Sequence, residues 1–106
     1  MPKYLFKASY TAQGEEGVRS KGGTDRRSAV SDMVSSVGGE LECLYFAFGE
    51  CDVFAIADMP DATAAAAASI ALSASGSVTS EAVVLLTPEE VDAAVKKSAS
   101  YTPPGR

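Results

Sequence analysis

The stretch that decides the fold runs from Glu40 to Met59 and reads ELECLYFAFGECDVFAIADM. Its apolar residues form two runs, and Gly49-Glu50 separates them in the manner of a tight turn. Each run carries apolar side chains on both alternating faces, which predicts two strands covered on both sides. A chain of 106 residues has few residues left to cover both faces of such a sheet. The hairpin therefore predicts a sheet shielded by helices on one face and by a partner subunit on the other.

A two-residue turn with glycine first predicts type II′ geometry, which requires a positive φ at Gly49. In that register Phe46 lies opposite Val53, and Cys43 lies opposite Ile56. The alternation also predicts two apolar patches, one on each face of the hairpin. They are Leu44, Phe46, Phe48 and Val53 on one face, and Leu41, Tyr45, Phe54 and Ile56 on the other.

The same register separates the two cysteines. Cys43 and Cys51 lie on opposite faces and roughly 16 Å apart along the ladder. A disulfide needs Cα atoms less than about 7 Å apart. We therefore expect two free thiols, as is usual in a reducing compartment.

The segments before the hairpin predict one strand and two helical pieces. Lys3 to Thr11 alternates with period two and is the first strand. Residues 12–37 are helical, but Gly22-Gly23 interrupts them, and Thr24 is the expected N-cap of the second piece. Gly38-Gly39 ends it. Its core-facing stripe is Ala29, Val30, Met33, Val34 and Val37.

The segments after the hairpin predict helix, strand and helix. Residues 61–75 form an alanine-rich helix whose first residue is the N-cap, and Gly76 ends it. Ser77 to Leu86 is the fourth strand. Thr87-Pro88-Glu89-Glu90 is a capping box with proline at the first helical position, and it begins a short helix that reaches about Lys97.

This order of elements predicts an α+β, ferredoxin-like βαββαβ fold with a C-terminal helix added. Its four-stranded antiparallel sheet has both long helices on one face. We expect a single domain over residues 1–100 and a flexible tail over residues 101–106. The doubly apolar hairpin further predicts a homodimer or higher homo-oligomer that pairs through the sheet face.

Composition excludes several classes of function. The chain has 9 basic and 14 acidic residues, a net charge of −5 and no basic run, so we expect no nucleic-acid partner. No apolar run approaches the length of a membrane span, so we expect a cytoplasmic protein without a membrane partner. Histidine is absent, which removes the usual general base and the commonest metal ligand. We expect neither a metal nor a cofactor.

Several short motifs, in order, resemble the GYD-domain family of small bacterial proteins. They are KYLFKASYTAQG from Lys3, DRR from Asp25, SVGGELE from Ser36, FAFGECD from Phe46, VFAIADMPD from Val53 and LLTPEEV from Leu85. The family is grouped with the dimeric α/β barrels, so the resemblance implies ferredoxin-like subunits that pair sheet to sheet into a barrel. Family members have tyrosine before the aspartate of the name motif, whereas this chain has Cys51. Any function of that tyrosine side chain is therefore lost in this chain or is carried by another residue.

Asp52 is the first candidate for a ligand site. An acid beside Phe54 and Ile56 could act as a base or anchor a ligand. The alternative is a turn aspartate that accepts hydrogen bonds from nearby backbone amides.

The other candidates for a ligand site are three tyrosines and an arginine. Tyr4, Tyr10 and Tyr45 could line a pocket and donate hydrogen bonds, or they could be core and interface residues. The segment from Gly22 to Arg27 places two arginines in the first turn of a helix. Arg27 is our candidate there for binding an anion, although the same segment also fits a capped helix with solvated arginines.

Three functions fit these observations. The first, which we favour, is an oligomeric domain that binds a small, partly apolar ligand or a protein partner in a cleft between sheet and helices. The second is a cofactor-independent enzyme of the monooxygenase or isomerase type, by analogy with other dimeric α/β barrels. The third is a purely structural module that forms oligomers.

Overall fold

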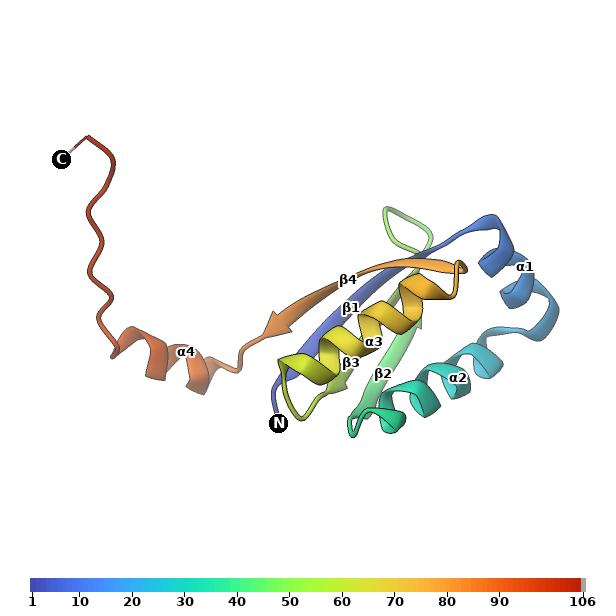
Figure 1. The fold of residues 1–106 in the computed structure, drawn as a ribbon, viewed down its shortest axis with the longest axis horizontal. Helices are drawn as coiled ribbons and strands as arrows, with labels where there is room; N and C mark the ends of the chain where they lie inside the picture. Colours follow the sequence, from blue (N-terminus) through green and yellow to red (C-terminus); the bar gives the residue numbers. More distant parts are fainter. Residues whose placement is uncertain (106) are drawn as a thin grey trace.

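The computed structural model describes residues 1–105, and its elements follow the predicted order (Figure 1). The strands form an antiparallel sheet in the order β2-β3-β1-β4. This is the ferredoxin-like α+β fold with an extra C-terminal helix, as predicted. The elements are β1 (Lys3–Tyr10), α1 (Ala12–Lys21), α2 (Gly23–Ser36), β2 (Glu40–Phe46), β3 (Val53–Asp58), α3 (Ala62–Ala74), β4 (Val78–Leu85) and α4 (Pro88–Val95). Within residues 1–105, no helix has the length and apolar character needed to cross a membrane.

Cap geometry confirms most of the predicted helix ends. The Asp61 carboxylate accepts a hydrogen bond of 2.8 Å from the Ala64 amide at the start of α3. Gly76 follows the end of α3 with a φ of 72°, a left-handed conformation that favours glycine. Thr87 and Glu90 form the capping box of α4, and the hydrogen bond that the Thr87 amide donates lowers the pKa of Glu90.

The predicted start of α2 is wrong by two residues. Gly22, not Thr24, is the N-cap, and it is also the C-cap of α1. Its φ of 86° is accessible to glycine without strain, so a single residue is enough to turn the chain from one helix into the next. Thr24 therefore lies inside the first turn of α2.

The β2–β3 hairpin has the predicted register. Phe46 lies opposite Val53, and Cys43 lies opposite Ile56. The hairpin places the two cysteines apart, and both are free thiols, as expected.

The predicted hairpin turn, in contrast, is wrong. The Ala47 amide donates to the Asp52 carbonyl oxygen at 2.8 Å, and residues 48–51 then connect the strands outside the ladder. Gly49 does not have the positive φ that a type II′ turn requires. The longer connection reverses the chain without a left-handed residue at Gly49.

A β-bulge at Glu42 changes the face on which Leu41 lies. Leu41 pairs with Ala57 and the next pair starts at Cys43, so Glu42 is left without a partner in β3. The extra residue turns Leu41 toward the helices, where it packs against the core. The prediction that Leu41 shares a patch with Tyr45 is wrong for this reason.

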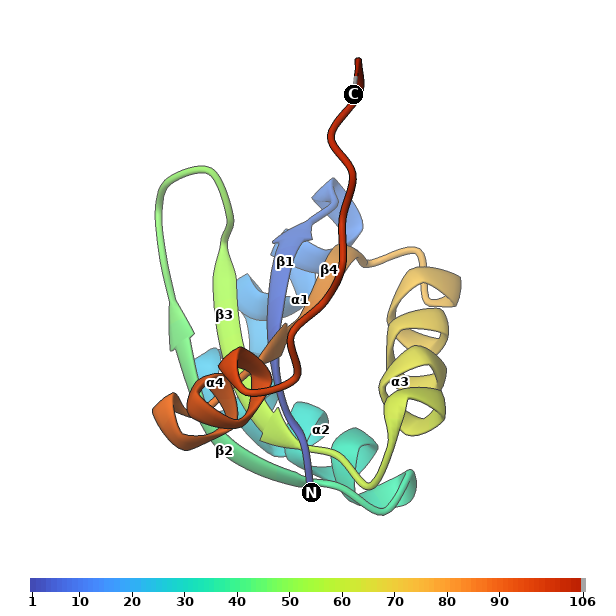
Figure 2. The same ribbon diagram turned by 90° about the vertical axis from the view of Figure 1, so that its left-hand side faces the viewer.

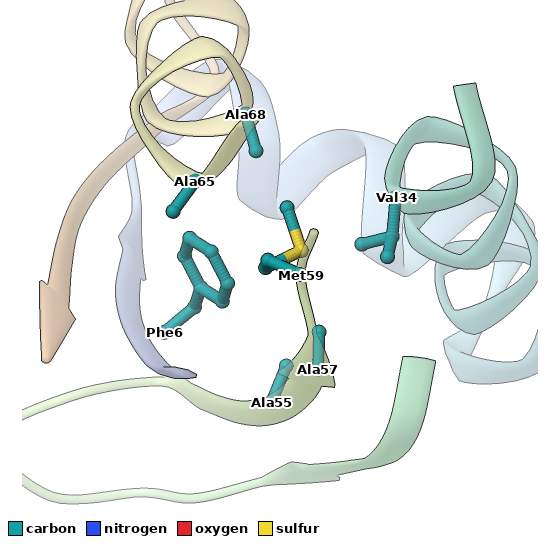
Figure 3. Close-up of a cluster of buried hydrophobic side chains, with 7 residues drawn as sticks. All are labelled: Phe6, Val34, Ala55, Ala57, Met59, Ala65 and Ala68. Carbon is teal, nitrogen blue, oxygen red and sulfur yellow. The ribbon is translucent and has the colours of Figure 1, made fainter. Parts of the chain in front are cut away.

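The core lies between the sheet and the helices α2 and α3 (Figures 2 and 3). Met59 is fully buried, with Val34 of α2 on one side and Ala65 and Ala68 of α3 on the other. Five of the ten buried apolar residues in the described chain are alanines, which lets helices lie close to the sheet but buries little apolar area. These alanines are Ala8, Ala55, Ala57, Ala65 and Ala68.

No helix packs across the opposite side of the sheet in the described chain. We call this side the open face. Its apolar side chains come from all four strands and alternate with those of the core side. They are Leu5, Cys43, Tyr45, Phe54, Ile56, Val83 and Leu85.

The segment from Leu86 to Gly105, which includes α4, extends away from the rest of the domain (Figure 1). We call it the arm. Every one of its residues is exposed. The radius of gyration is 16.7 Å, whereas a compact domain of this length has about 13 Å. The C-terminal helix therefore adds no cover to the sheet of its own chain.

Candidate ligand-binding site

An apolar cavity of about 30 Å³ lies between the helix layer and the centre of the sheet. α2 packs mainly on the edge strand β2, and α3 packs mainly on the opposite edge strand β4. The cavity lies over the central strands β1 and β3, where the short side chains of Ala8 and Ala55 leave space between the residues of α2 and α3. The lining residues are Phe6, Ala8, Tyr10, Arg26, Val30, Met33, Val34, Leu41, Leu44, Val53, Ala55, Leu72 and Val78.

The cavity continues outward between α2 and α3. A hollow of about 190 Å³ lies there, and its outer rim includes Ala29, Ala71 and Ser75. The inner cavity and this hollow share part of their lining, so we treat them as one site and call it the helix cleft. The shared residues are Arg26, Val30, Met33 and Leu72.

Among residues 1–105, Arg26 is the only charged residue that lines the inner cavity. Its Nε is shielded from solvent and has no hydrogen-bond partner within residues 1–105. No carboxylate in that part of the chain forms an ion pair with it. A guanidinium stays charged at any physiological pH, and a buried charged donor without an acceptor costs free energy. The helix cleft therefore presents an unused charged donor at the edge of an apolar space.

Tyr10 and Asp52 meet beside this cleft. Asp52 Oδ2 accepts a hydrogen bond of 2.8 Å from the Tyr10 amide, and the Asp52 amide donates to the Ala8 carbonyl at 2.9 Å. The carboxylate thus extends the pairing of β1 with β3 beyond its last backbone pair, Ala8 with Val53. Tyr10 and Asp52 also line a second hollow of about 260 Å³, which includes Phe46 and Phe48.

A sequence model of the GYD domain matches residues 4–95. The chain belongs to the GYD domain family. No curated protein and no solved structure matched the chain. The family match confirms the resemblance described above, but it assigns no ligand or activity.

This GYD domain does not bring its five predicted site residues together. Tyr10 and Asp52 are neighbours, but Tyr4 packs against the core, with its ring 6.4 Å from that of Phe6. Tyr45 is 69% exposed on the open face. Arg27 lines a separate, polar hollow between α2 and β2.

Arg26 is the site residue that sequence reasoning missed in this GYD domain. It precedes Val30 by four residues and Met33 by seven, so it lies on the core-facing stripe of α2. The sequence did contain a signal for this role, because an arginine lies on an otherwise apolar stripe. Its place near the start of the helix made it look like a solvated cation instead.

The described part of the chain contains no group of three or more His, Cys, Asp or Glu side chains that could hold a metal ion. Cys43 and Cys51 are both half-buried and unpaired by disulfides. Arg26, Tyr10 and the apolar lining of the helix cleft are therefore the groups from which we build a site.

Proposed function

We propose that this GYD domain binds a small, partly apolar molecule in the helix cleft and acts as a homodimer paired through its open face. The apolar cavity that opens between α2 and α3 carries the ligand part of the proposal. Ligand sites are commonly apolar spaces with a few polar groups at defined positions. The inner cavity alone has room for only about two water molecules. A ligand must therefore extend into the outer part of the cleft.

Tyr10 and Asp52 support this site in different ways. Tyr10 lines both the inner cavity and the hollow beside it, so its side chain lies between the two spaces. Asp52 holds the Tyr10 backbone through its carboxylate. We propose that Asp52 positions Tyr10.

The open face supports the homodimer. Tyr45 and Val83 are 69% and 36% exposed, and they lie next to half-buried Phe54 and Leu5. Apolar side chains gathered on one face in this way usually mark an interface. The arm supports it too, because an isolated helix as short as α4 is marginal in water and gains stability by packing against another surface.

The ligand part can be tested with two eight-carbon probes, octanol and octanoate. We expect at least one of them to shift the amide NMR signals of Val30, Met33 and Leu72. Ala71→Trp places a large ring at the outer rim of the cleft and should abolish these shifts. Ala66→Trp is the matched control, because Ala66 is also exposed on α3 but lines no part of the cleft. If neither probe shifts these signals, the helix cleft is not a ligand site.

A further inference from the structure

We propose that the helix cleft selects acids: its ligand is a small apolar molecule with one carboxylate, which accepts hydrogen bonds from the Arg26 guanidinium. This proposal rests on the ligand-binding function proposed above and adds the chemical class of the ligand.

Arg26 lies where three hollows meet. It lines the inner cavity, the opening between α2 and α3, and a third hollow of about 360 Å³ that is bordered by α1 and the start of β4. A ligand group placed at Arg26 therefore lies at the junction between the apolar interior and the outside. That is the position which suits the polar end of an amphipathic molecule.

The charge of Arg26 is not neutralised inside the described chain. Lys3, for comparison, is bridged by Glu42 and Asp58, and these hydrogen bonds raise the pKa of Lys3. Asp25 lines the third hollow but not the inner cavity, and it forms no ion pair with Arg26. Among residues 1–105, no carboxylate thus competes for the guanidinium on the cavity side.

A carboxylate is the acceptor that best fits a guanidinium. It accepts two parallel N–H bonds, and such charge-assisted bonds are stronger than neutral ones. The apolar body of the ligand would lie against Val30, Met33 and Leu72, which line both parts of the cleft. A neutral molecule would fill the same space but leave the Arg26 Nε unpaired, and a cation would be repelled.

The test compares octanoate with octanol, which have the same chain length and differ in charge at pH 7. We expect wild-type protein to bind octanoate about tenfold or more tightly than octanol, measured by NMR titration. Arg26→Met should remove this preference and leave octanol binding intact. Arg27→Met is the matched control, because it removes the same charge one residue later, outside the cleft, and should leave the preference unchanged.

A second measurement uses the ligand-free protein. Arg26 is half-buried and its shielded Nε has no acceptor within residues 1–105, so an apolar side chain of similar length should not lower stability. Arg26→Met should therefore melt at or above the wild-type temperature. A lower melting temperature would mean that Arg26 has a structural partner, and it would count against the proposal.

The outcomes separate the two proposals. If octanol binds the wild-type cleft as tightly as octanoate, or if Arg26→Met retains the preference for octanoate, acid selection is wrong while ligand binding stands. If neither probe binds, the proposed function itself fails. The comparison in wild-type protein needs no variant, so it decides the question even if Arg26→Met does not fold.

Discussion

Asp52 lies at the point where the backbone pairing between β1 and β3 stops. A strand amide beyond this point would have no acceptor, and the Asp52 carboxylate supplies one for Tyr10 at 2.8 Å. The Asp52 amide and carbonyl also form hydrogen bonds, to Ala8 and Ala47. One residue thus connects three segments that border the helix cleft and the neighbouring hollow.

We predict that Asp52→Ala lowers the free energy of unfolding by about 1 kcal/mol, the usual net contribution of one hydrogen bond. For a domain of this size, the melting temperature should fall by about 4–8 °C. Asp52→Asn keeps an oxygen that can accept from Tyr10 and should cost less. Thermal unfolding followed by circular dichroism measures both changes.

Glu50→Ala is the matched control for Asp52, because Glu50 is an exposed acid in the same connection. It should leave the melting temperature unchanged. If Asp52→Ala is fully stable, the hydrogen bond to the Tyr10 amide does not hold that backbone, and Asp52 is not a positioning residue.

At the scale of elements, α1 joins the end of β1 to the start of β4. The Thr11 amide donates to the Ser77 carbonyl at 3.0 Å, and the Thr11 hydroxyl donates to the Gly76 carbonyl at 2.9 Å. Gly14 makes this approach possible, because a Cβ at that position would lie 2.0 Å from the Ser77 oxygen. The close contact holds the segment that carries Tyr10.

We predict opposite effects for two glycine substitutions in α1. Gly14→Ala should destabilise the protein by about 1–3 kcal/mol, because the backbone of Ser77 must move. Gly17→Ala is the matched control, since a Cβ at Gly17 has no neighbour within 4 Å. It should stabilise the protein by about 0.5–1 kcal/mol through helix propensity. Equal melting temperatures for the two variants would show that α1 does not lie against Ser77 as described.

The sequence predicted the order of elements because each element carries its own local signal. The Asp61 cap and the capping box at Thr87 are complete within a few residues. The bulge at Glu42 has no such signal. Leu41 and Tyr45 are four positions apart, so an unbroken strand would place them on the same face. The side of the sheet on which Leu41 lies depends on how β2 pairs with β3, which the local sequence does not encode.

The helix cleft was predicted only in outline. A cleft between sheet and helices follows from the fold, but its volume depends on how far α2 lies from α3, which is a matter of tertiary packing. The role of Arg26 depends on that same distance. Arg27, one residue along, is also an arginine near the start of α2, but it lines a different hollow.

At the scale of the whole molecule, residues 1–105 cover only one side of the sheet. The core is thin and rich in alanine, and the open face carries large apolar side chains. The arm does not pack on that face, because all of its residues are exposed. A closed dimer would bury the same patch twice, once on each subunit. The dimer and the helix cleft use opposite faces of the sheet, so ligand entry between α2 and α3 stays free in the proposed assembly.

We predict that the wild-type protein sediments as a dimer, or a multiple of it, at low micromolar concentration. Tyr45→Lys should raise the dissociation constant by about tenfold to a hundredfold, because a charge replaces a large ring in both copies of a symmetric interface. Ile70→Lys is the matched control: Ile70 is also 69% exposed, but it lies on α3, on the other side of the sheet. It should leave the dimer intact. A wild-type monomer would contradict the predicted pairing, and a control variant that dissociates as readily as Tyr45→Lys would place the interface on the helices instead.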